Sequence, residues 1–153
     1  MHLTTFSDLG LRVLMILGDV PPGEQLTIRQ LSDAVNASNN HLSKVVAKLA
    51  ELNLVVSVRG RNGGVLLAEG TRDVPVGKIL RQLEGPGEVV ECGGSKPCPL
   101  MYRDCQLRHR LAAAREAFFV ELDKDTIGEL ISQTQPAPAG SVGIGLPSVR
   151  PAD

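Results

Sequence analysis

The apolar residues of the first third of the chain recur at three- and four-residue steps, the spacing of one face of an α-helix. The pattern occupies residues 6–17, 28–35 and 39–52. Thr27 and Ser38 precede the second and third stretches as N-caps, and Ser7 or Thr5 is expected to cap the first. The third stretch is the most regular, with an apolar face made of Leu42, Val45, Val46, Leu49 and Leu52. The sequence therefore predicts three consecutive helices.

Two strand-like segments follow at residues 54–59 and 65–68, and both are rich in Val and Leu. Between them lies Gly60-Arg61-Asn62-Gly63-Gly64, a glycine-rich turn with a basic tip. This pattern predicts a two-stranded β hairpin. Three helices followed by such a hairpin form a winged helix-turn-helix, so residues 1–72 are predicted to be a DNA-binding domain of this type.

The rest of the chain is expected to be mainly helical as well, which makes the fold class mostly α. Short helices are predicted at residues 76–83, entered through Pro75, and at residues 126–131. Between them lies a long amphipathic helix with the apolar stripe Leu107, Leu111, Ala114, Phe118 and Leu122. We therefore predict a second unit at residues 73–133 and a disordered Pro- and Gly-rich tail at residues 134–153.

The chain of 153 residues carries a formal net charge of -1, which argues against a uniformly basic nucleic-acid coat. Its hydrophobic content of 42% suits one modest core. Positive charge is nevertheless concentrated in residues 27–64, where basic residues outnumber acidic ones. The N-terminus lacks a basic region followed by an apolar stretch, and no window is long enough to cross a bilayer, so a cytoplasmic protein is expected.

The third helix occupies the position of a recognition helix, which inserts into the major groove of DNA. Asn side chains pair with adenine, and Lys side chains contact guanine or phosphate. At the hairpin turn, glycines allow the backbone to approach a minor groove or its phosphates. The predicted contacts to double-stranded operator DNA are Arg29, Ser38, Asn39, Asn40, His41, Ser43, Lys44, Lys48, Arg59, Arg61 and Asn62.

Three cysteines, Cys92, Cys98 and Cys105, are spaced C-x5-C-x6-C before the long helix. An odd number of thiols in a reducing compartment favours metal or redox chemistry over disulfides. Zinc is disfavoured because structural zinc sites use closely spaced Cys pairs and a fourth Cys or His. A helix from Cys98 to Cys105 would separate their backbones by about 10 Å, so we predict a loop that wraps a cluster and a helix with Asp104 as its N-cap.

Three thiolates leave one coordination position for a ligand of another kind. The candidates are Asp8, His41, Glu91, Asp104 and His109. His109 lies one helical turn beyond Cys105, whereas Asp8 is distant in sequence and needs tertiary or dimer contacts to reach the thiols. A hard carboxylate oxygen on a soft iron-sulfide site would be the weakest bond of the set. It would be the natural point of attack for a small reactive molecule.

The chain resembles the NsrR and IscR type of winged-helix iron-sulfur regulators, and the nitric oxide-sensing NsrR type is the nearer match. The resemblance covers residues 1 to about 132 and is carried by Leu3-Thr4-Thr5-Phe6-Ser7-Asp8-Leu9, the turn Arg59-Gly60-Arg61-Asn62-Gly63-Gly64, Leu83-Glu84-Gly85 and Cys98-Pro99-Leu100. It implies a homodimeric repressor that packs through its long helices. It also implies an iron-sulfur cluster on Cys92, Cys98 and Cys105, [4Fe-4S] rather than [2Fe-2S], and release of DNA when nitric oxide attacks this cluster.

The resemblance also bears on the fourth ligand. In the NsrR type this ligand is an aspartate in the first helix of the partner subunit, and Asp8 occupies that place. In the IscR type it is a His three positions after the last cysteine, where this chain has Arg108, with His109 one residue later. The six-residue spacing before Cys105 is one longer than the NsrR pattern. Asp8 is therefore the predicted ligand, and His109 is the alternative.

Three other functions of the cysteines stay open. A metal-free thiol switch would exchange disulfides on oxidation, an IscR-like regulator would report whether its cluster is present, and a zinc ion would only staple the fold. A small iron-sulfur enzyme or electron carrier is disfavoured, since the chain shows no substrate motif and no second set of thiols. The chain is therefore not expected to be an enzyme.

Overall fold

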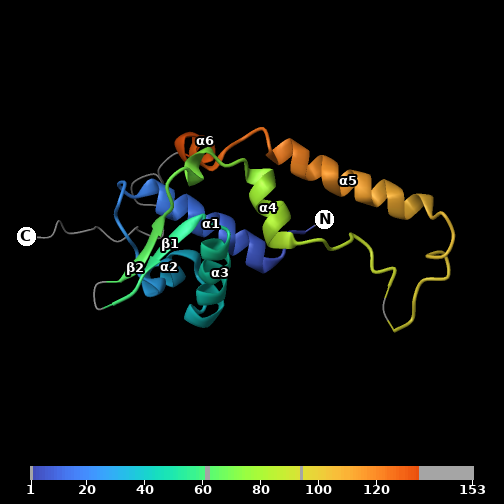
Figure 1. Ribbon diagram of the computed structural model, residues 1–153, viewed down its shortest axis with the longest axis horizontal. Coiled ribbons are helices and arrows are strands. Elements are labelled where there is room, and N and C mark those ends of the chain that lie inside the picture. Colours follow the sequence, from blue (N-terminus) through green and yellow to red (C-terminus); the bar gives the residue numbers. More distant parts are fainter. Residues whose placement is uncertain (1, 61–62, 94, 135–153) are drawn as a thin grey trace, which may run out of the picture.

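The computed structural model describes residues 2–60, 63–93 and 95–134 (Figure 1). In chain order its elements are α1 (Thr5–Asp19), α2 (Ile28–Val35), α3 (Asn39–Glu51), β1 (Val55–Val58), β2 (Gly64–Leu67), the 3-10 helix η1 (Thr71–Asp73), α4 (Val76–Glu84), α5 (Gln106–Leu122) and α6 (Ile127–Gln133). The predicted fold class, mostly α with a two-stranded wing, is confirmed. Of the tail predicted at residues 134–153, residues 135–153 lie outside the described residues.

The first three helices pack around an apolar core that the wing closes. The predicted face of α3 is buried, and Leu42, Val45 and Leu49 have no exposed surface. β1 and β2 form an antiparallel sheet, in a register that runs from Val55 opposite Leu67 to Val58 opposite Gly64. The backbones of Leu26 and Val65 exchange two hydrogen bonds of 2.9 and 2.8 Å, which attach the segment before α2 to the wing.

Side-chain caps fix where the first three helices begin. Thr27 and Ser38 cap α2 and α3 as predicted, each accepting a 3.2 Å hydrogen bond from a backbone amide three residues later. The expected cap of α1 is wrong: Thr4 accepts the hydrogen bond from the Ser7 amide, so α1 begins at Thr5. The Ser7 side chain is buried inside the first turn instead. These caps determine which residues α1 and α3 present at their N-terminal ends.

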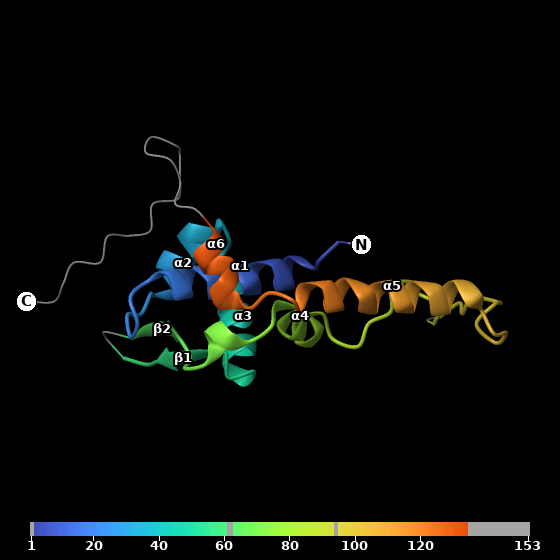
Figure 2. The same cartoon turned by 90° about the horizontal axis from the view of Figure 1, so that it is seen from above.

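The helix α5 extends from the winged-helix part as a long arm (Figures 1 and 2). Its base is held by Phe119, which is fully buried, and the guanidinium carbons of Arg81 and Arg115 lie 5.2 and 4.8 Å from the centroid of its ring. Arg81 also bonds Asp123 at 2.7 Å. A Cβ atom added at Gly77 would lie 2.1 Å from the Phe119 carbonyl oxygen, so glycine is required where α4 and α5 cross.

Of the apolar stripe predicted for α5, Leu122 at the end of the helix is partly buried against the core, whereas the outer part of the stripe lies open. Phe119 is the one buried residue of this helix, and it lies off the predicted stripe. Leu107 is 65% exposed and Phe118 is 36% exposed. The outer part of the stripe stays open because the outer part of the arm has no other helix of the same chain beside it (Figure 2). A helix with apolar residues left in solvent is a candidate for contact with another molecule.

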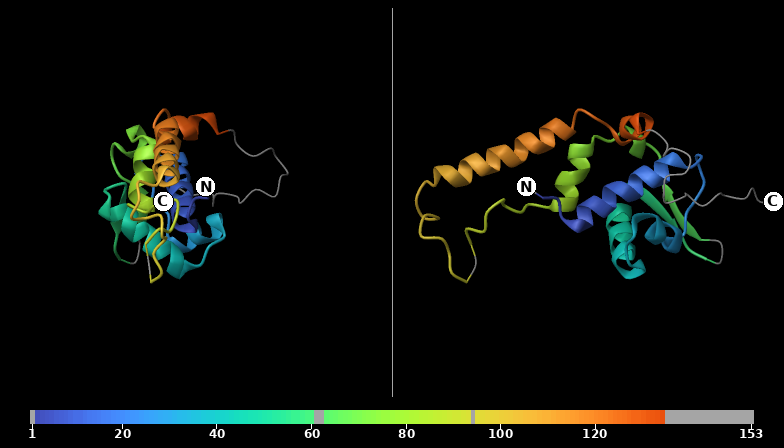
Figure 3. Two further views of the ribbon diagram at one scale, coloured as in Figure 1. Left: turned by 90° about the vertical axis from the view of Figure 1, so that its right-hand side faces the viewer. Right: turned by 180° about the vertical axis from the view of Figure 1, so that it is seen from behind.

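The wing and the cysteine segment lie toward opposite ends of the long axis (Figure 1; Figure 3, right). The N-terminal end of α1 faces the side from which the arm extends, whereas the wing lies on the other side (Figures 1 and 2). After α5 the chain returns, and α6 packs beside the other end of α1. No helix in the described ranges is long and apolar enough to cross a membrane.

Candidate DNA-binding face and cysteine site

The polar start of α3 is open to solvent. Asn39, Asn40 and Lys44 are exposed, as expected for side chains that read a DNA groove. Arg29 on α2 and Arg59 after β1 are exposed as well, and neither forms an ion pair within the described residues. The predicted contacts Arg61 and Asn62 lie outside the described part of the chain.

Other predicted DNA contacts have partners in the protein. The Ser43 hydroxyl donates a 2.7 Å hydrogen bond to the Asn39 carbonyl. The Lys48 ammonium lies 3.0 Å from the Glu51 carboxylate, which reduces its net charge toward DNA. The His41 ring is half-buried against Phe6 of α1, with 6.4 Å between the ring centroids. His41 therefore links the recognition helix to the N-terminal end of α1.

The three cysteines lie along one loop between α4 and α5. All are free thiols, and each is half-buried. The Cys98 amide donates a 3.0 Å hydrogen bond to the Cys92 carbonyl, which folds the loop back on itself, and the Met101 amide donates to the Cys98 carbonyl at 2.9 Å. Among the described residues, no three Cys, His, Asp or Glu side chains converge closely enough to hold a metal ion. The three thiols are close in sequence, but in the described residues they do not form a metal-binding group.

The start of α5 differs from the prediction. Cys105 is the N-cap, not Asp104, and no side chain accepts a hydrogen bond from the first amides of the helix. The Asp104 carboxylate instead bonds the Gln106 side-chain amide at 2.9 Å and His109 Nε2 at 2.7 Å. The uncapped amides and the positive end of the helix dipole thus lie beside the Cys105 thiol, where they favour negative charge.

The candidate fourth ligands have other partners in the single chain. Asp8 lies in the first turn of α1, and its Oδ1 atom is 2.9 Å from the Nε atom of Arg12. His109 bonds Asp104, as described above, and Glu91 is exposed. None of these side chains joins a thiol group within the described residues. The Asp8 side chain remains 43% exposed.

An ion pair that was not predicted closes the cysteine loop. The Nε atom of Arg108, in the first turn of α5, lies 3.1 and 2.9 Å from the two carboxylate oxygens of Glu88, and the Nη2 atom contacts Glu88 as well. Hydrogen bonding in this pair raises the pKa of Arg108 and lowers that of Glu88. The charges of Cys92 and Cys105 raise the pKa of Arg108 further. Arg108 therefore lies within electrostatic reach of both thiols.

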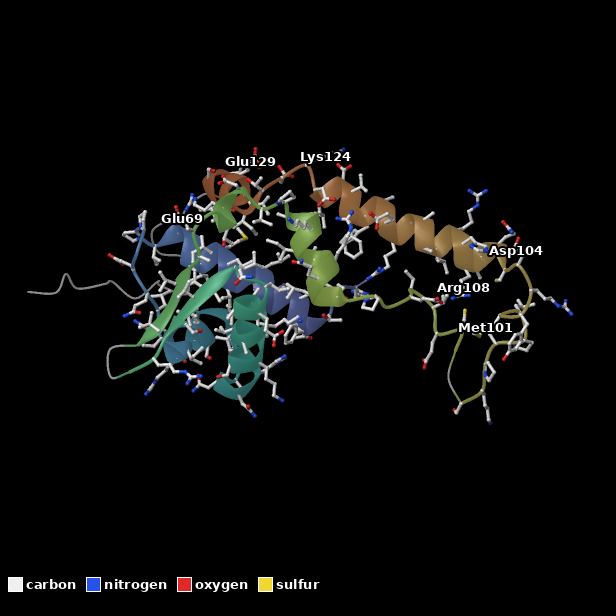
Figure 4. The ribbon with its side chains drawn as sticks, in the orientation of Figure 1. Glu69, Met101, Asp104, Arg108, Lys124 and Glu129 are labelled. Atoms are coloured by element: carbon white, nitrogen blue, oxygen red, sulfur yellow. The ribbon has the colours of Figure 1, made fainter. Side chains whose placement is uncertain are left out.

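The ion pair borders a hollow of about 520 Å³, whose lining includes Cys92, Gly93, Met101 and Arg108. Arg108 projects from the start of α5 toward the loop that carries Met101 (Figure 4). The sequence offered one signal for this pair: opposite charges flank the cysteine segment, four residues before Cys92 and three after Cys105. The sequence did not predict this pair because a loop residue and a helix residue twenty positions apart share no periodicity that indicates a contact.

A second junction connects the loop to α1. The Glu84 Oε1 atom, at the end of α4, accepts hydrogen bonds from the Thr4 amide and hydroxyl at 2.9 and 3.0 Å. Partial burial works to raise the pKa of Glu84, but the hydrogen bonds from Ser7 and Thr4 outweigh it and lower the pKa. Arg115 of α5 donates a 2.7 Å hydrogen bond to the Gly85 carbonyl, where the loop begins. The start of α1, the end of α4 and α5 are thus joined.

Comparison with known proteins identifies the family to which this chain belongs. Residues 3–133 match the Rrf2 family, described as iron-dependent transcriptional regulators. The chain belongs to the Rrf2 family. It is 42% identical to the HTH-type transcriptional repressor NsrR of Streptomyces coelicolor over 147 residues, which are 95% of this chain and 96% of that protein. It is thus an Rrf2-family transcriptional regulator similar to NsrR, as the sequence resemblance indicated.

Solved structures support the same fold. The chain is similar to CymR, the global cysteine regulator of B. subtilis, with 27% identity and a TM-score of 0.66 over 88% of this chain and 99% of that one. It is also similar in fold to T. potens IscR, with 21% identity and a TM-score of 0.67 over 90% of this chain and 94% of that one. The order of helices and wing is therefore that of Rrf2 regulators.

Proposed function

We propose that this Rrf2 regulator is a homodimeric repressor that binds operator DNA, holds an iron-sulfur cluster and releases the DNA when nitric oxide reaches that cluster. The observation that supports this function most is the loop with three free thiols in a chain 42% identical to NsrR over 95% of its length. The alternatives differ in what the thiols bind or in which signal they report.

For DNA binding, the exposed start of α3 would enter the major groove. Asn39 and Asn40 offer amides for base edges, and Lys44 offers a charge for guanine or phosphate. Arg29 and Arg59 flank this helix and would contact the DNA backbone, with Arg61 and Asn62 at the tip of the wing. A dimer would present two such helices to two half-sites, so the spacing between subunits sets the affinity for the operator.

The residues of the loop fit an iron-sulfur cluster in their chemistry. The donors are three soft sulfur atoms, each half-buried, one of them at an uncapped helix N-terminus that favours an anionic group. When bound, the cluster, with [4Fe-4S] favoured over [2Fe-2S], supplies iron that reacts with nitric oxide. Cys92, Cys98 and Cys105 would hold it, and Asp8 of the partner would complete the set, with His109 as the alternative.

The protein can transmit a change at this site through contacts already described. A shift of α1 that frees Asp8 acts on Thr4 and its hydrogen bonds to Glu84. It also acts on Phe6, whose ring lies against His41 of the recognition helix. The signal thus has a direct route from the N-terminal end of α1 to the start of α3. A small movement there changes the distance between the two recognition helices of a dimer.

The decisive experiment is anaerobic purification followed by iron, sulfide and absorbance measurements, with binding to an operator selected from random DNA before and after addition of nitric oxide. We expect a coloured protein that contains iron and sulfide, and a fall in DNA affinity of at least about tenfold after nitric oxide, which corresponds to about 1.4 kcal/mol. Equal DNA affinity of the cluster-loaded, cluster-free and nitric oxide-treated proteins would refute the proposal.

The alternatives give other results in the same experiment. A colourless protein without iron that loses DNA binding on oxidation would identify a thiol switch. A coloured protein whose DNA binding depends on cluster content but not on nitric oxide would identify an IscR-like reporter of cluster status. Zinc without iron would leave only a structural metal.

A further inference from the structure

We propose that Arg108 is a positioning residue of the cysteine site: its ion pair with Glu88 fastens the two ends of the cysteine loop together, so that Cys92 and Cys105 are held near each other before anything binds. This inference rests on the proposed use of the loop as a cluster site. The ion pair is proposed to position the loop, whereas the cysteines and Asp8 are proposed to be the ligands of the cluster.

The geometry supports a fastening role. Glu88 lies four residues before Cys92, and Arg108 lies three residues after Cys105, so the pair spans the whole segment that carries the thiols. Both carboxylate oxygens take part, and side-on contact of this kind fixes orientation as well as distance. Arg108 belongs to a rigid helix turn, whereas Glu88 belongs to the loop. The pair therefore anchors the loop segment on the helix.

The position of Arg108 is otherwise unfavourable. A cation in the first turn of a helix lies at the positive end of the helix dipole, and α5 has no acidic residue in its first turn. Glu88 supplies the missing negative charge from outside the helix. A loop whose ends are already joined loses less conformational entropy when its thiols are brought together, because part of the cost of closure has been met.

The test measures the closeness of two thiols in the cluster-free full chain. In a Cys98→Ser background, the effective concentration of Cys92 for Cys105 is obtained from their disulfide equilibrium with glutathione. All variants are compared at the same pH and the same glutathione concentrations, so that a difference between them reports the loop. The variants are Glu88→Gln, Arg108→Gln and the exchanged pair Glu88→Arg with Arg108→Glu.

We expect Glu88→Gln and Arg108→Gln each to lower the effective concentration about three- to fivefold, the range for a partly exposed ion pair. The exchanged pair should return it to within about twofold of the parent. Arg110→Gln is the matched control: it removes the same charge from the same helix, where Arg110 forms no ion pair within the described residues. It should leave the value unchanged.

The two single variants separate fastening from simple charge. Glu88→Gln and Arg108→Gln change the local charge in opposite directions. An effect of charge alone would therefore shift the effective concentration of the two thiols in opposite directions, whereas loss of the ion pair lowers it in both variants. Opposite shifts, unchanged values or a parent that forms no Cys92–Cys105 disulfide would overturn the inference. Because no cluster is present, this result is independent of whether the protein binds iron or responds to nitric oxide.

Discussion

At the scale of single residues, Asp8 is the side chain whose role is most open to direct test. In the single chain it pairs with Arg12 at the adjacent helical turn, an exposed contact of a kind that contributes about 0.3–0.5 kcal/mol. A ligand role would need the same carboxylate to leave Arg12 and meet the thiols of another subunit. The two roles predict different consequences for the two members of the pair.

We expect Asp8→Ala to keep the fold and most of the iron, because three thiolates remain, but to lose the cluster to a chelator about tenfold faster. The first measurement is the decay of cluster absorbance in an anaerobic chelator solution. The second is the rate at which the cluster-loaded protein reacts with nitric oxide. Arg12→Ala is the control, since it breaks the same ion pair and leaves the carboxylate in place. Equal decay rates for the two variants and the parent would assign Asp8 a purely structural role.

Some of these residue-scale features follow from sequence spacing, and others do not. The exposed Asn39, Asn40 and Lys44 were predictable because the apolar period of α3 fixes which face turns outward. The contact of His41 with Phe6 and the pair of Arg108 with Glu88 were not, because each joins segments whose relative position only the folded chain defines.

At the scale of elements, the junction of α1 with α4 combines a helix cap with the half-buried charge of Glu84. Glu84 accepts two hydrogen bonds from Thr4, the residue that caps α1. The lowered pKa of Glu84 means that the folded state prefers the ionised carboxylate. The stabilisation is therefore fully present above the ordinary pKa of a Glu and is lost as pH falls through the lowered pKa of the folded state.

We expect Glu84→Gln to lower the free energy of unfolding by about 1 kcal/mol at neutral pH, since a charge-assisted hydrogen bond is replaced by a neutral one. The difference from the parent should shrink as the pH falls through the lowered pKa of Glu84, because the parent then loses its charge as well. Urea unfolding at a series of pH values from neutral downwards measures this. Glu121→Gln, which affects only the exposed pair with Lys124, is the control and should change little. A difference that stays constant with pH would contradict the proposed role of the charge.

The helices and the wing were predictable because each has a local period and a local cap. The start of α5 was not: Asp104 has the composition of an N-cap, yet its carboxylate bonds Gln106 and His109, and Cys105 takes the cap position. The capping propensity of a residue describes which hydrogen bonds its side chain can form at a helix end. Here the Asp104 side chain bonds other side chains instead, so it does not cap α5. The residues of the predicted α5 stripe have helical spacing, but in one chain Leu122 packs against the core while Leu107 and Phe118 stay exposed.

At the scale of the whole molecule, the proposed sensor and the DNA-binding face are far apart. The wing lies toward one end of the long axis, and the arm with the cysteine loop lies toward the other (Figures 1 and 3). One chain alone therefore leaves the arm projecting into solvent with Leu107 and Phe118 exposed. We expect a second copy to pack along α5 and to cover these side chains. The proposed Asp8 ligand would require the α1 helix of that copy to lie near the loop.

We expect Phe118→Glu to raise the dissociation constant of the dimer at least about a hundredfold. The symmetry of a dimer places the change on both sides, and burial of one Phe contributes about 1.5–3 kcal/mol. Light scattering over a range of protein concentrations measures the dissociation constant. The same variant should bind operator DNA more weakly at concentrations where it is monomeric, because one half-site is then contacted at a time.

The control for that variant is Ala113→Glu, which adds the same charge to an exposed position of α5 on the side opposite the stripe, at 100° per residue. It should leave both the dimer and DNA binding unchanged. If Phe118→Glu dimerised as tightly as the parent, the dimer would have to form through another face. Packing along the stripe of α5 could then no longer explain how Asp8 reaches the thiols of the partner subunit. Both variants add the same charge, and only Phe118→Glu also removes a side chain of the stripe, so a difference between them locates the dimer contact on the predicted stripe.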